Sequence, residues 1–120
     1  MIRTVIVDDD RGMRLVARML AEEEGCVVVG EAETGEDSVR LVSRLEPDLV
    51  ILDYRLPDID GVETARRLSR AVPGVAIIGW TSSEEPAVAE AFIDAGACAH
   101  AVKGDFVAFR AALRYVQAPA

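Results

Sequence analysis

The sequence predicts an α/β fold, a doubly wound, five-stranded parallel sheet with five helices. Short β-branched runs alternate five times with longer segments in which apolar residues recur every three or four positions. The connecting loops are short, and strand-helix pairs joined in this way form right-handed crossovers with helices on both faces of the sheet. The chain has 120 residues, 51% of them hydrophobic, which is enough for one domain with one core.

The first half of the chain begins with a strand expected at residues 3–7. Residues 12–24 have the period of a helix, and Gly25 ends it. A second strand is expected at residues 27–30. The next helix has Thr34 as its N-cap, because Asp37 stands three residues on in an approximate capping box.

The second helix stops at Glu46 and Pro47, and the apolar run at residues 49–52 follows. A run without polar alternation is typical of a central strand covered on both faces. The later helices are expected at residues 62–71, 85–96 and 106–116, and the later strands at 75–80 and 99–102. We expect one domain over residues 1–117, with residues 118–120 as a tail or the start of a linker.

The charge balance is acidic, with 21 acidic residues against 13 basic ones and a formal net charge of −8. Such a chain repels a polyanion unless its basic residues gather on one face. No basic cluster appears in the sequence, so we expect no direct binding of nucleic acid.

The expected location is the cytoplasm. Asp8 follows the N-terminus too soon for a signal peptide, and no apolar run is long enough to cross a bilayer, so we expect no membrane contact. Cys26 and Cys98 have no second pair and no nearby histidine, which favours two reduced, packed cysteines over a disulfide or a zinc site.

Polar residues follow the predicted strands. Ligands of open α/β sheets bind beyond the carboxyl ends of the strands, at the point where the winding reverses. Glu31 ends the second strand but points away from the centre. The other strands end in Asp8-Asp9-Asp10, Asp53, Thr81-Ser82-Ser83 and Lys103.

Carboxylates from two strand ends repel one another, and a bound cation relieves the repulsion. Mg²⁺ suits the site, because it takes oxygen ligands and keeps waters that a phosphate can replace. Lys103 adds a positive charge and Thr81 a hydroxyl donor. Together these groups can neutralise a phosphoryl group during its transfer.

The chain resembles the receiver domain of two-component response regulators over essentially its whole length. The matching segments are VIVDDDRGMR, PDLVILDYRLPDIDGVE, WTSS and AHAVKG. Four separated matches at four strand ends are much more specific than any one of them. The resemblance implies a flavodoxin-like sheet of receiver type with the strand order 2-1-3-4-5.

The resemblance also implies roles for the strand-end residues. Asp53 is the expected phosphoacceptor and forms an acyl phosphate. Asp9, Asp53 and the backbone carbonyl of Arg55 are expected to hold Mg²⁺, with Asp8 acting mostly through a coordinated water. Self-phosphorylation and self-dephosphorylation would depend on this Mg²⁺.

The remaining roles concern the signal. Lys103 would bind a phosphoryl oxygen, and Thr81 would move toward the phosphoryl group and carry its strand and the following helix with it. Arg55 and Ser83 occupy positions that tune the lifetime of the phosphoryl group. His100 corresponds to the family's aromatic switch residue, although a lone histidine is as often structural.

The sequence departs from the family pattern after Lys103, and Asp10 is expected to have a role outside the site. The family generally has proline after the lysine of the last strand, whereas Gly104 follows Lys103 here. Asp10 is expected to face solvent or to cap the first helix.

The expected partners are a sensor histidine kinase or a phosphotransfer protein. The first predicted helix carries more apolar residues than one core-facing stripe needs, among them Met13 and Val16, which we assign to partner docking; burial against the last helix is the alternative. A homodimer on phosphorylation is a further option. The chain could be a stand-alone receiver or the N-terminal part of a DNA-binding transcription regulator.

Other classes of protein fit less well. A pseudo-receiver that binds proteins without phosphorylation would keep the fold alone, and Gly104 and His100 leave this option open. A haloacid-dehalogenase phosphatase needs a second Asp two residues after the nucleophile, where Arg55 stands. A flavin-binding domain needs a phosphate-cradling loop after the first strand, which is missing.

Overall fold

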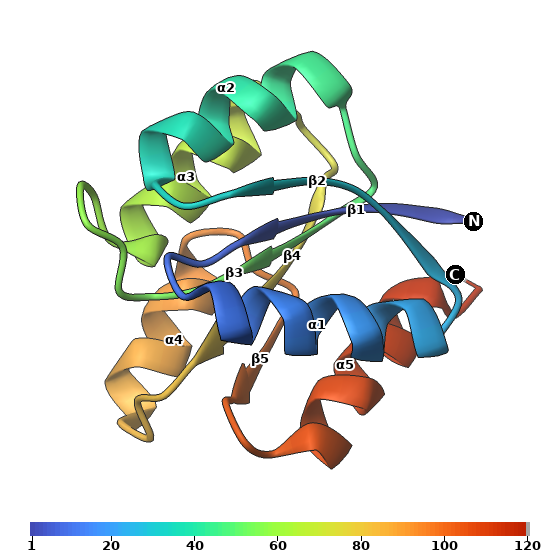
Figure 1. Ribbon diagram of the computed structural model, residues 1–120. Coiled ribbons are helices and arrows are strands. Elements are labelled where there is room, and N and C mark those ends of the chain that lie inside the picture. Colours follow the sequence, from blue (N-terminus) through green and yellow to red (C-terminus); the bar gives the residue numbers. More distant parts are fainter. Residues whose placement is uncertain (120) are drawn as a thin grey trace.

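The computed structural model describes residues 1–119 and contains a five-stranded parallel sheet with helices on both faces (Figure 1). The strand order is β2-β1-β3-β4-β5, and every neighbouring pair is parallel. The predicted fold class is therefore confirmed; Ala120 of the expected tail lies outside the described residues. The strands are β1 (Ile2–Val7), β2 (Cys26–Ala32), β3 (Leu49–Leu52), β4 (Ala76–Thr81) and β5 (Ala99–Val102).

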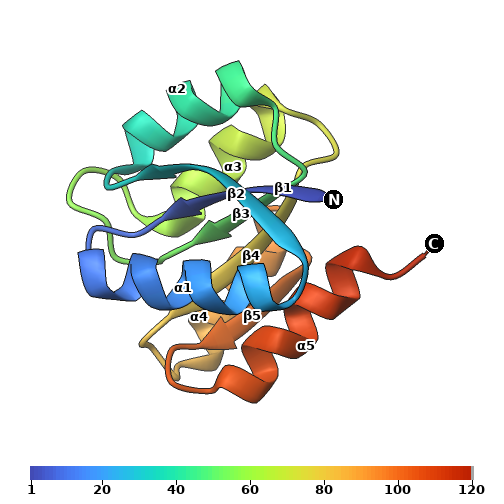
Figure 2. The same cartoon turned by 45° about the vertical axis from the view of Figure 1, so that its right-hand side comes forward.

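Two helices pack on one face of the sheet and three on the other, so the domain has three layers (Figure 2). On the first face are α1 (Arg11–Glu23) and α5 (Phe106–Gln117). The helices of the second face are α2 (Gly35–Leu45), α3 (Gly61–Ala71) and α4 (Pro86–Asp94). The winding reverses between β1 and β3, which places the switch point at their carboxyl ends.

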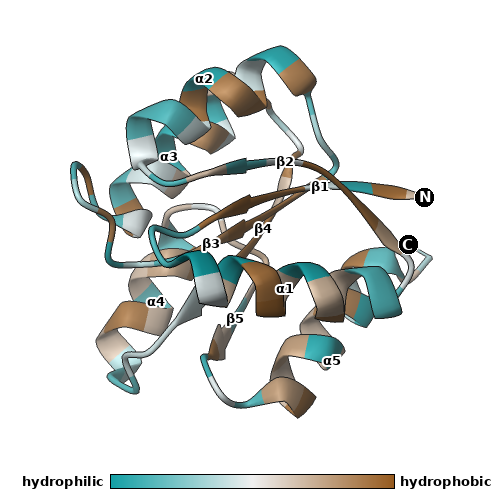
Figure 3. Ribbon diagram, viewed as in Figure 1, coloured by the Kyte–Doolittle hydropathy of each residue, from teal (hydrophilic) through white to brown (hydrophobic). Residues whose placement is uncertain are grey.

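β3 is buried over its whole length, as the apolar run at residues 49–52 predicted. Figure 3 shows that β3 and its neighbour β1 are strongly hydrophobic where they lie between the helices. Leu49 and Ile51 belong to the core under α1 and α5, whereas Val50 and Leu52 belong to the core under the other helices. Because successive side chains of a strand point to opposite faces, one short run supplies both cores.

Side-chain caps start four of the helices. The Asp10 carboxylate accepts from the Met13 N–H at 2.9 Å, and the Thr34 hydroxyl accepts from the Asp37 N–H at 3.0 Å. These bonds confirm the capping roles expected for Asp10 and Thr34. Asp60 and Asp105 cap α3 and α5 in the same way.

The structure differs from the expected bounds at β2, which runs on from residue 30 to Ala32. Glu31 and Ala32 pair with Ile6 and Val7, so pairing with β1 extends the strand past a glycine and a glutamate of low strand propensity. Conversely, α4 ends at Asp94, before Gly96 with its φ of +114°.

One expectation about the cysteines was wrong. Cys26 is buried, but Cys98 is exposed. Cys98 lies in the connection before β5, where its N–H and its Sγ donate to the Ile77 carbonyl at 2.9 Å and 3.4 Å, so the thiol contacts β4 although the residue is exposed. Within residues 1–119, the structure contains no helix with the length and apolarity needed to span a membrane.

Candidate functional site

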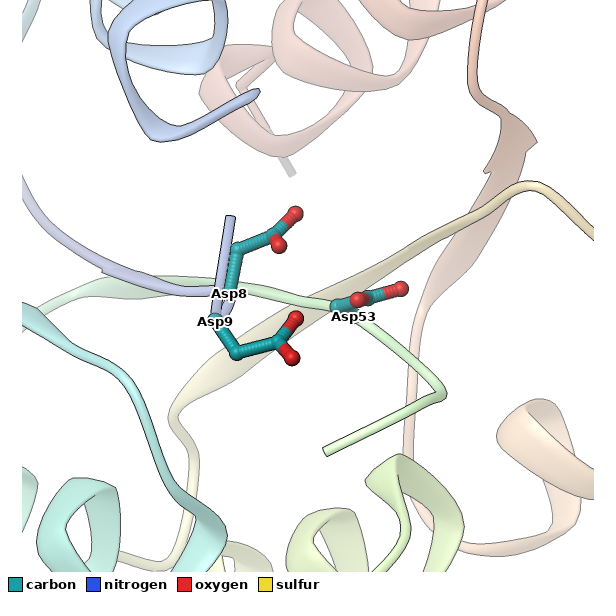
Figure 4. Close-up of side chains that lie close together, drawn as sticks. All are labelled: Asp8, Asp9 and Asp53. Atoms are coloured by element: carbon teal, nitrogen blue, oxygen red, sulfur yellow. The ribbon is translucent and has the colours of Figure 1, made fainter. Parts of the chain in front are cut away.

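The carboxyl ends of β1 and β3 bring three aspartates together, as predicted (Figure 4). Val7 pairs with Leu52 in the sheet, and the Asp53 N–H donates to the Val7 carbonyl at 2.9 Å, so the residues that follow both strands are neighbours. Asp8, Asp9 and Asp53 each offer an oxygen within 4.8 Å of the others. Asp8 and Asp53 are buried, whereas Asp9 is exposed to incoming ligands.

Lys103 lies in the same pocket. Its Nζ is 2.6 Å from Asp8 Oδ2 and 3.3 Å from Asp53 Oδ2. The Lys103 N–H donates to the Thr81 carbonyl at 2.7 Å, which continues the β4–β5 pairing past the end of β5. Its Nζ also lies 5.7 Å from the centroid of the buried Trp80 ring. One ammonium therefore faces two buried carboxylates.

The electrostatics of the pocket favour an added cation. Burial and the charge of Asp8 raise the pKa of Asp53, Lys103 and the Tyr54 N–H lower it, and the net result is a pKa of about 6. The single ammonium does not offset the cost of ionising Asp53. Three clustered carboxylates are the hard oxygen donors that Mg²⁺ prefers, so the residues present fit this ion.

Thr81 ends β4 and is fully buried. Its hydroxyl oxygen accepts from the Ser83 N–H at 3.2 Å, and the Ser83 hydroxyl accepts from the Glu85 N–H at 3.2 Å. The two hydroxyls that the sequence singles out are thus held by the turn that leads into α4.

His100 is half-buried in β5, and its ring centroid lies 5.7 Å from that of Phe92. Burial lowers the pKa of His100, so the ring is neutral at pH 7. Its Nε2 is buried without a hydrogen-bond partner within residues 1–119. Phe92 also packs edge-on against Tyr54, the residue after Asp53, at 6.1 Å.

The two residues assigned to partner docking are less exposed than a docking surface requires. Met13 and Val16 are half-buried and pack against the core under α1 and α5. The exposed apolar side chains of α1 are instead Leu15 and Met19. Arg55 is exposed in the loop between β3 and α3.

Two residues between Asp53 and the start of α3 also shape the site, and they were not predicted from the sequence. The Asp58 carboxylate accepts from the N–H groups of Gly35 and Glu36, both at 2.8 Å, and so holds the loop on the first turn of α2. Although desolvation opposes it, these backbone donors lower the pKa of Asp58. At Gly61 an added Cβ would lie 2.1 Å from the Asp53 carbonyl oxygen. In the sequence, only the turn-forming run PDIDG points to the bonds of Asp58 and to the close approach of Gly61.

Gly104, the departure from the family pattern, has a φ of +94°. Proline holds φ near −65° and cannot adopt this conformation. The glycine thus matches the turn that follows Lys103, in which the Asp105 N–H donates to the Val102 carbonyl at 3.0 Å.

A doubly wound sheet with three clustered aspartates and a facing lysine at its switch point defines a class of α/β domains with an acidic strand edge. The model of the response regulator receiver domain family matches residues 4–113, and the chain belongs to this family.

Relatives of known name are similar to this chain over most of its length. The chain is 39% identical over 105 residues to the response regulator GacA of Pseudomonas aeruginosa, covering 87% of this chain and 49% of the relative. It is 40% identical over 103 residues to a protein-glutamate methylesterase/protein-glutamine glutaminase of Syntrophus aciditrophicus, covering 82% and 29%. The chain therefore spans half or less of the length of these relatives.

Solved structures share the fold. A two-component response regulator of the LuxR family from Aurantimonas superposes with a TM-score of 0.91 at 29% identity, covering 97% of this chain and 84% of that one.

Proposed function

We propose that this chain is a phosphoacceptor receiver that takes a phosphoryl group onto Asp53 from a sensor histidine kinase or a phosphotransfer protein. The observation that carries the proposal is the position of Asp53, buried 3.3 Å from the Lys103 ammonium and clustered with Asp8 and Asp9. A carboxylate so placed has a cation beside it at the point where phosphoryl charge would develop.

The two oxygens of Asp53 have different roles in the proposed step. Oδ1 accepts from the Tyr54 N–H at 2.8 Å, which fixes the carboxylate plane. Oδ2 faces Lys103 and is the oxygen we assign as nucleophile. Its lone pair forms the new O–P bond while the donor's N–P bond breaks and its electron pair returns to the donor nitrogen. Lys103 then neutralises a phosphoryl oxygen.

Asp9, Asp53 and the Arg55 carbonyl would hold Mg²⁺, with Asp8 acting mostly through a coordinated water. Bound there, the ion supplies positive charge to the phosphoryl oxygens. The raised pKa of Asp53 supports this assignment, because a cation that pairs with the carboxylate relieves the penalty of its burial beside Asp8.

The proposed signal starts at Thr81. Its hydroxyl would leave the Ser83 N–H and donate to the phosphoryl group, which would shift the turn into α4. His100, packed on Phe92 of α4, is the proposed switch residue, and Arg55 and Ser83 would tune the lifetime of the acyl phosphate. Met13 and Val16 remain the proposed contacts for the phosphodonor.

The lengths of the relatives bear on the protein to which this receiver belongs. GacA is about twice the length of the matched region, which supports a place for this receiver in a longer response regulator. A similarity of 35% identity to a putative transcriptional regulator of Pseudomonas aeruginosa supports the proposal that this longer protein is a transcription regulator that binds DNA in the cytoplasm. Dimerisation on phosphorylation belongs to the same proposal.

The test is direct phosphorylation. The purified chain with Mg²⁺ and a small phosphodonor, such as acetyl phosphate or phosphoramidate, should gain one phosphoryl mass in the mass spectrometer. Asp53→Asn should show no gain, whereas Asp94→Asn, an exposed aspartate on α4, should gain as the wild type does. A wild-type chain inert to both donors, or a modified Asp53→Asn, would contradict the proposal.

The second candidate is a pseudo-receiver, favoured by His100 at the switch position and by Gly104 after Lys103. Trp80 separates the two, because its buried ring lies 5.7 Å from Lys103 Nζ. A live site should change Trp80 fluorescence when Mg²⁺ and beryllofluoride are added. A flat signal with both would favour the pseudo-receiver.

A further inference from the structure

A groove lies outside the acidic pocket, between α1, the carboxyl end of the edge strand β2, and α2. It has a volume of about 1030 Å³. Carboxylates line it too, but they are outnumbered; they are Glu31, Glu33 and Asp37. The arginines that line it are Arg11, Arg14, Arg18, Arg40 and Arg44. The groove is therefore positive on a chain whose formal net charge is −8.

Two of these arginines are available to a partner. Arg14, Arg18 and Arg40 form ion pairs with the carboxylates of the groove. Arg11 and Arg44 are exposed and form no ion pair within residues 1–119. One lies at the start of α1 and the other in the last turn of α2, so the free cations come from both walls of the groove.

The lining of the groove is partly apolar. Leu15 of α1 is 58% exposed, and Leu41 of α2 is half-buried across from it. A well-matched occupant therefore presents carboxylates beside an exposed aliphatic side chain.

This chain carries such a surface on α4 and the turn before it. Residues 81–102 contain no lysine or arginine. Val88 and Phe92 pack into the core, whereas Ile93 is 48% exposed. The acidic side chains are all exposed: Glu84, Glu85, Glu90 and Asp94. Within residues 1–119 none of them forms an ion pair.

The groove and α4 cannot meet within one molecule. The groove lies along β2, which is one edge strand, and α4 connects β4 to β5 at the other edge (Figure 1). Any contact between them joins one molecule to the next.

We propose that the α1–α2 groove binds α4 of a second copy of this chain in a head-to-tail contact. A two-turn helical segment about 11 Å long and 10 Å across occupies roughly 850 Å³, which the groove can accept. The proposal is independent of the phosphoacceptor function. Because the two faces differ, a dimer keeps a free α4 on one copy and a free groove on the other, so the assembly can grow.

The strength of association between copies should depend on salt concentration. At about 0.15 M ionic strength the screening length is about 8 Å, so ion pairs across the contact persist while repulsion between the distant acidic surfaces is weakened. At about 1 M the length falls to about 3 Å, and the ion pairs are screened as well. Association should therefore be weaker at 1 M than at 0.15 M.

The test is sedimentation equilibrium of the whole chain. At 0.15 M salt the average mass should rise above the 12.9 kDa of the monomer as concentration increases toward about 1 mM, the range of weak contacts. Arg11→Ala with Arg44→Ala in the groove, or Glu90→Ala with Asp94→Ala on α4, should weaken association at least fivefold.

Matched controls are Arg70→Ala in the last turn of α3 and Glu22→Ala in α1, both exposed and outside the groove and α4. They should leave association unchanged. Equal loss in these controls, or a wild type that stays monomeric to about 1 mM, overturns the proposal.

Mixing the two double variants tests the head-to-tail geometry. One variant retains α4 and the other retains the groove, so the mixture has a single intact contact. It should form a heterodimer of near wild-type affinity and nothing larger. A mixture that stays monomeric overturns the proposal. So does a wild-type chain that remains monomeric while its groove binds a separate acidic peptide, since the occupant is then another protein.

Discussion

At the level of single residues, the pKa of Asp53 determines the charge of the pocket. This pKa is raised because the side chain is buried and lies near the like charge of Asp8. An ionised carboxylate beside Asp8 is costly, and Lys103 compensates only part of that cost. A cation bound by the same pair of carboxylates would relieve their repulsion.

The raised pKa of Asp53 predicts a pH dependence of stability in the absence of metal. Between its ordinary value of 3.8 and about 6, the folded chain holds the Asp53 proton more tightly than the unfolded chain does. The free energy of unfolding contributed by this residue should therefore fall as pH rises from about 4 to about 6. The loss is at most about 3 kcal/mol, because a tenfold change in proton affinity corresponds to about 1.4 kcal/mol.

Urea unfolding with a chelator, at several pH values, measures this effect as the difference between the wild type and Asp53→Asn. Other titrating groups, His100 included, are common to both proteins and cancel. A difference independent of pH would show that Asp53 titrates normally.

At the level of elements, the loop between β3 and α3 is held at both ends. Asp58 binds the first turn of α2, and Gly61 approaches the Asp53 backbone, with its N–H 2.6 Å from the Tyr54 carbonyl. The loop that carries Arg55 is therefore positioned by two helices at once.

Removal of the Asp58 carboxylate should destabilise the chain. Asp58→Ala takes two hydrogen bonds from the N-terminus of α2, and the expected cost is about 1–2 kcal/mol, the range of a lost helix cap. Asp94→Ala, exposed and without an ion pair in residues 1–119, serves as the control. Chemical denaturation measures both; equal stability of the two variants would show that Asp58 does not hold α2.

Gly61→Ala tests the close approach itself. The added methyl group would lie 2.1 Å from the Asp53 carbonyl oxygen and 2.8 Å from the Tyr54 Cα, so the backbone must move. We expect a loss of more than about 2 kcal/mol, beyond the usual effect of a point mutation, and a shifted amide resonance for Asp53. Gly74→Ala, at a site where a Cβ meets no atom within 4 Å, should cause no shift at Asp53.

For the whole molecule, the site ties ligand binding to global stability, because Asp8 and Asp53 come from different strands of one sheet. A ligand bound only by the folded chain stabilises it according to its concentration relative to Kd.

Mg²⁺ should therefore raise the free energy of unfolding by about 1.4 kcal/mol at ten times its Kd. Asp9→Asn, which changes an exposed residue proposed to bind the ion, should abolish most of the gain, whereas Asp10→Asn should keep it, because asparagine still caps α1. Thermal unfolding with and without Mg²⁺ measures the gain. An equal gain in both variants would place the ion elsewhere.

Most of the fold was predictable because its signals are local. The periods of the apolar residues depend on neighbours within one strand or helix, and so do the caps at Asp10 and Thr34. The gathering of Asp8, Asp53 and Lys103 followed from one topological rule, since parallel strands place their carboxyl ends on the same edge.

The sequence by itself thus determined the order of the elements, the strand-end residues and the family. Only the tertiary structure decided which groups meet between elements distant in the chain. It placed Asp58 at the start of α2, extended β2 to Ala32, and left Cys98 exposed. The raised pKa of Asp53 belongs to the same group, because burial and the distance to Asp8 exist only once the strands have paired. Periodicity records which face of an element is apolar, but the partner of that face depends on packing across the whole molecule.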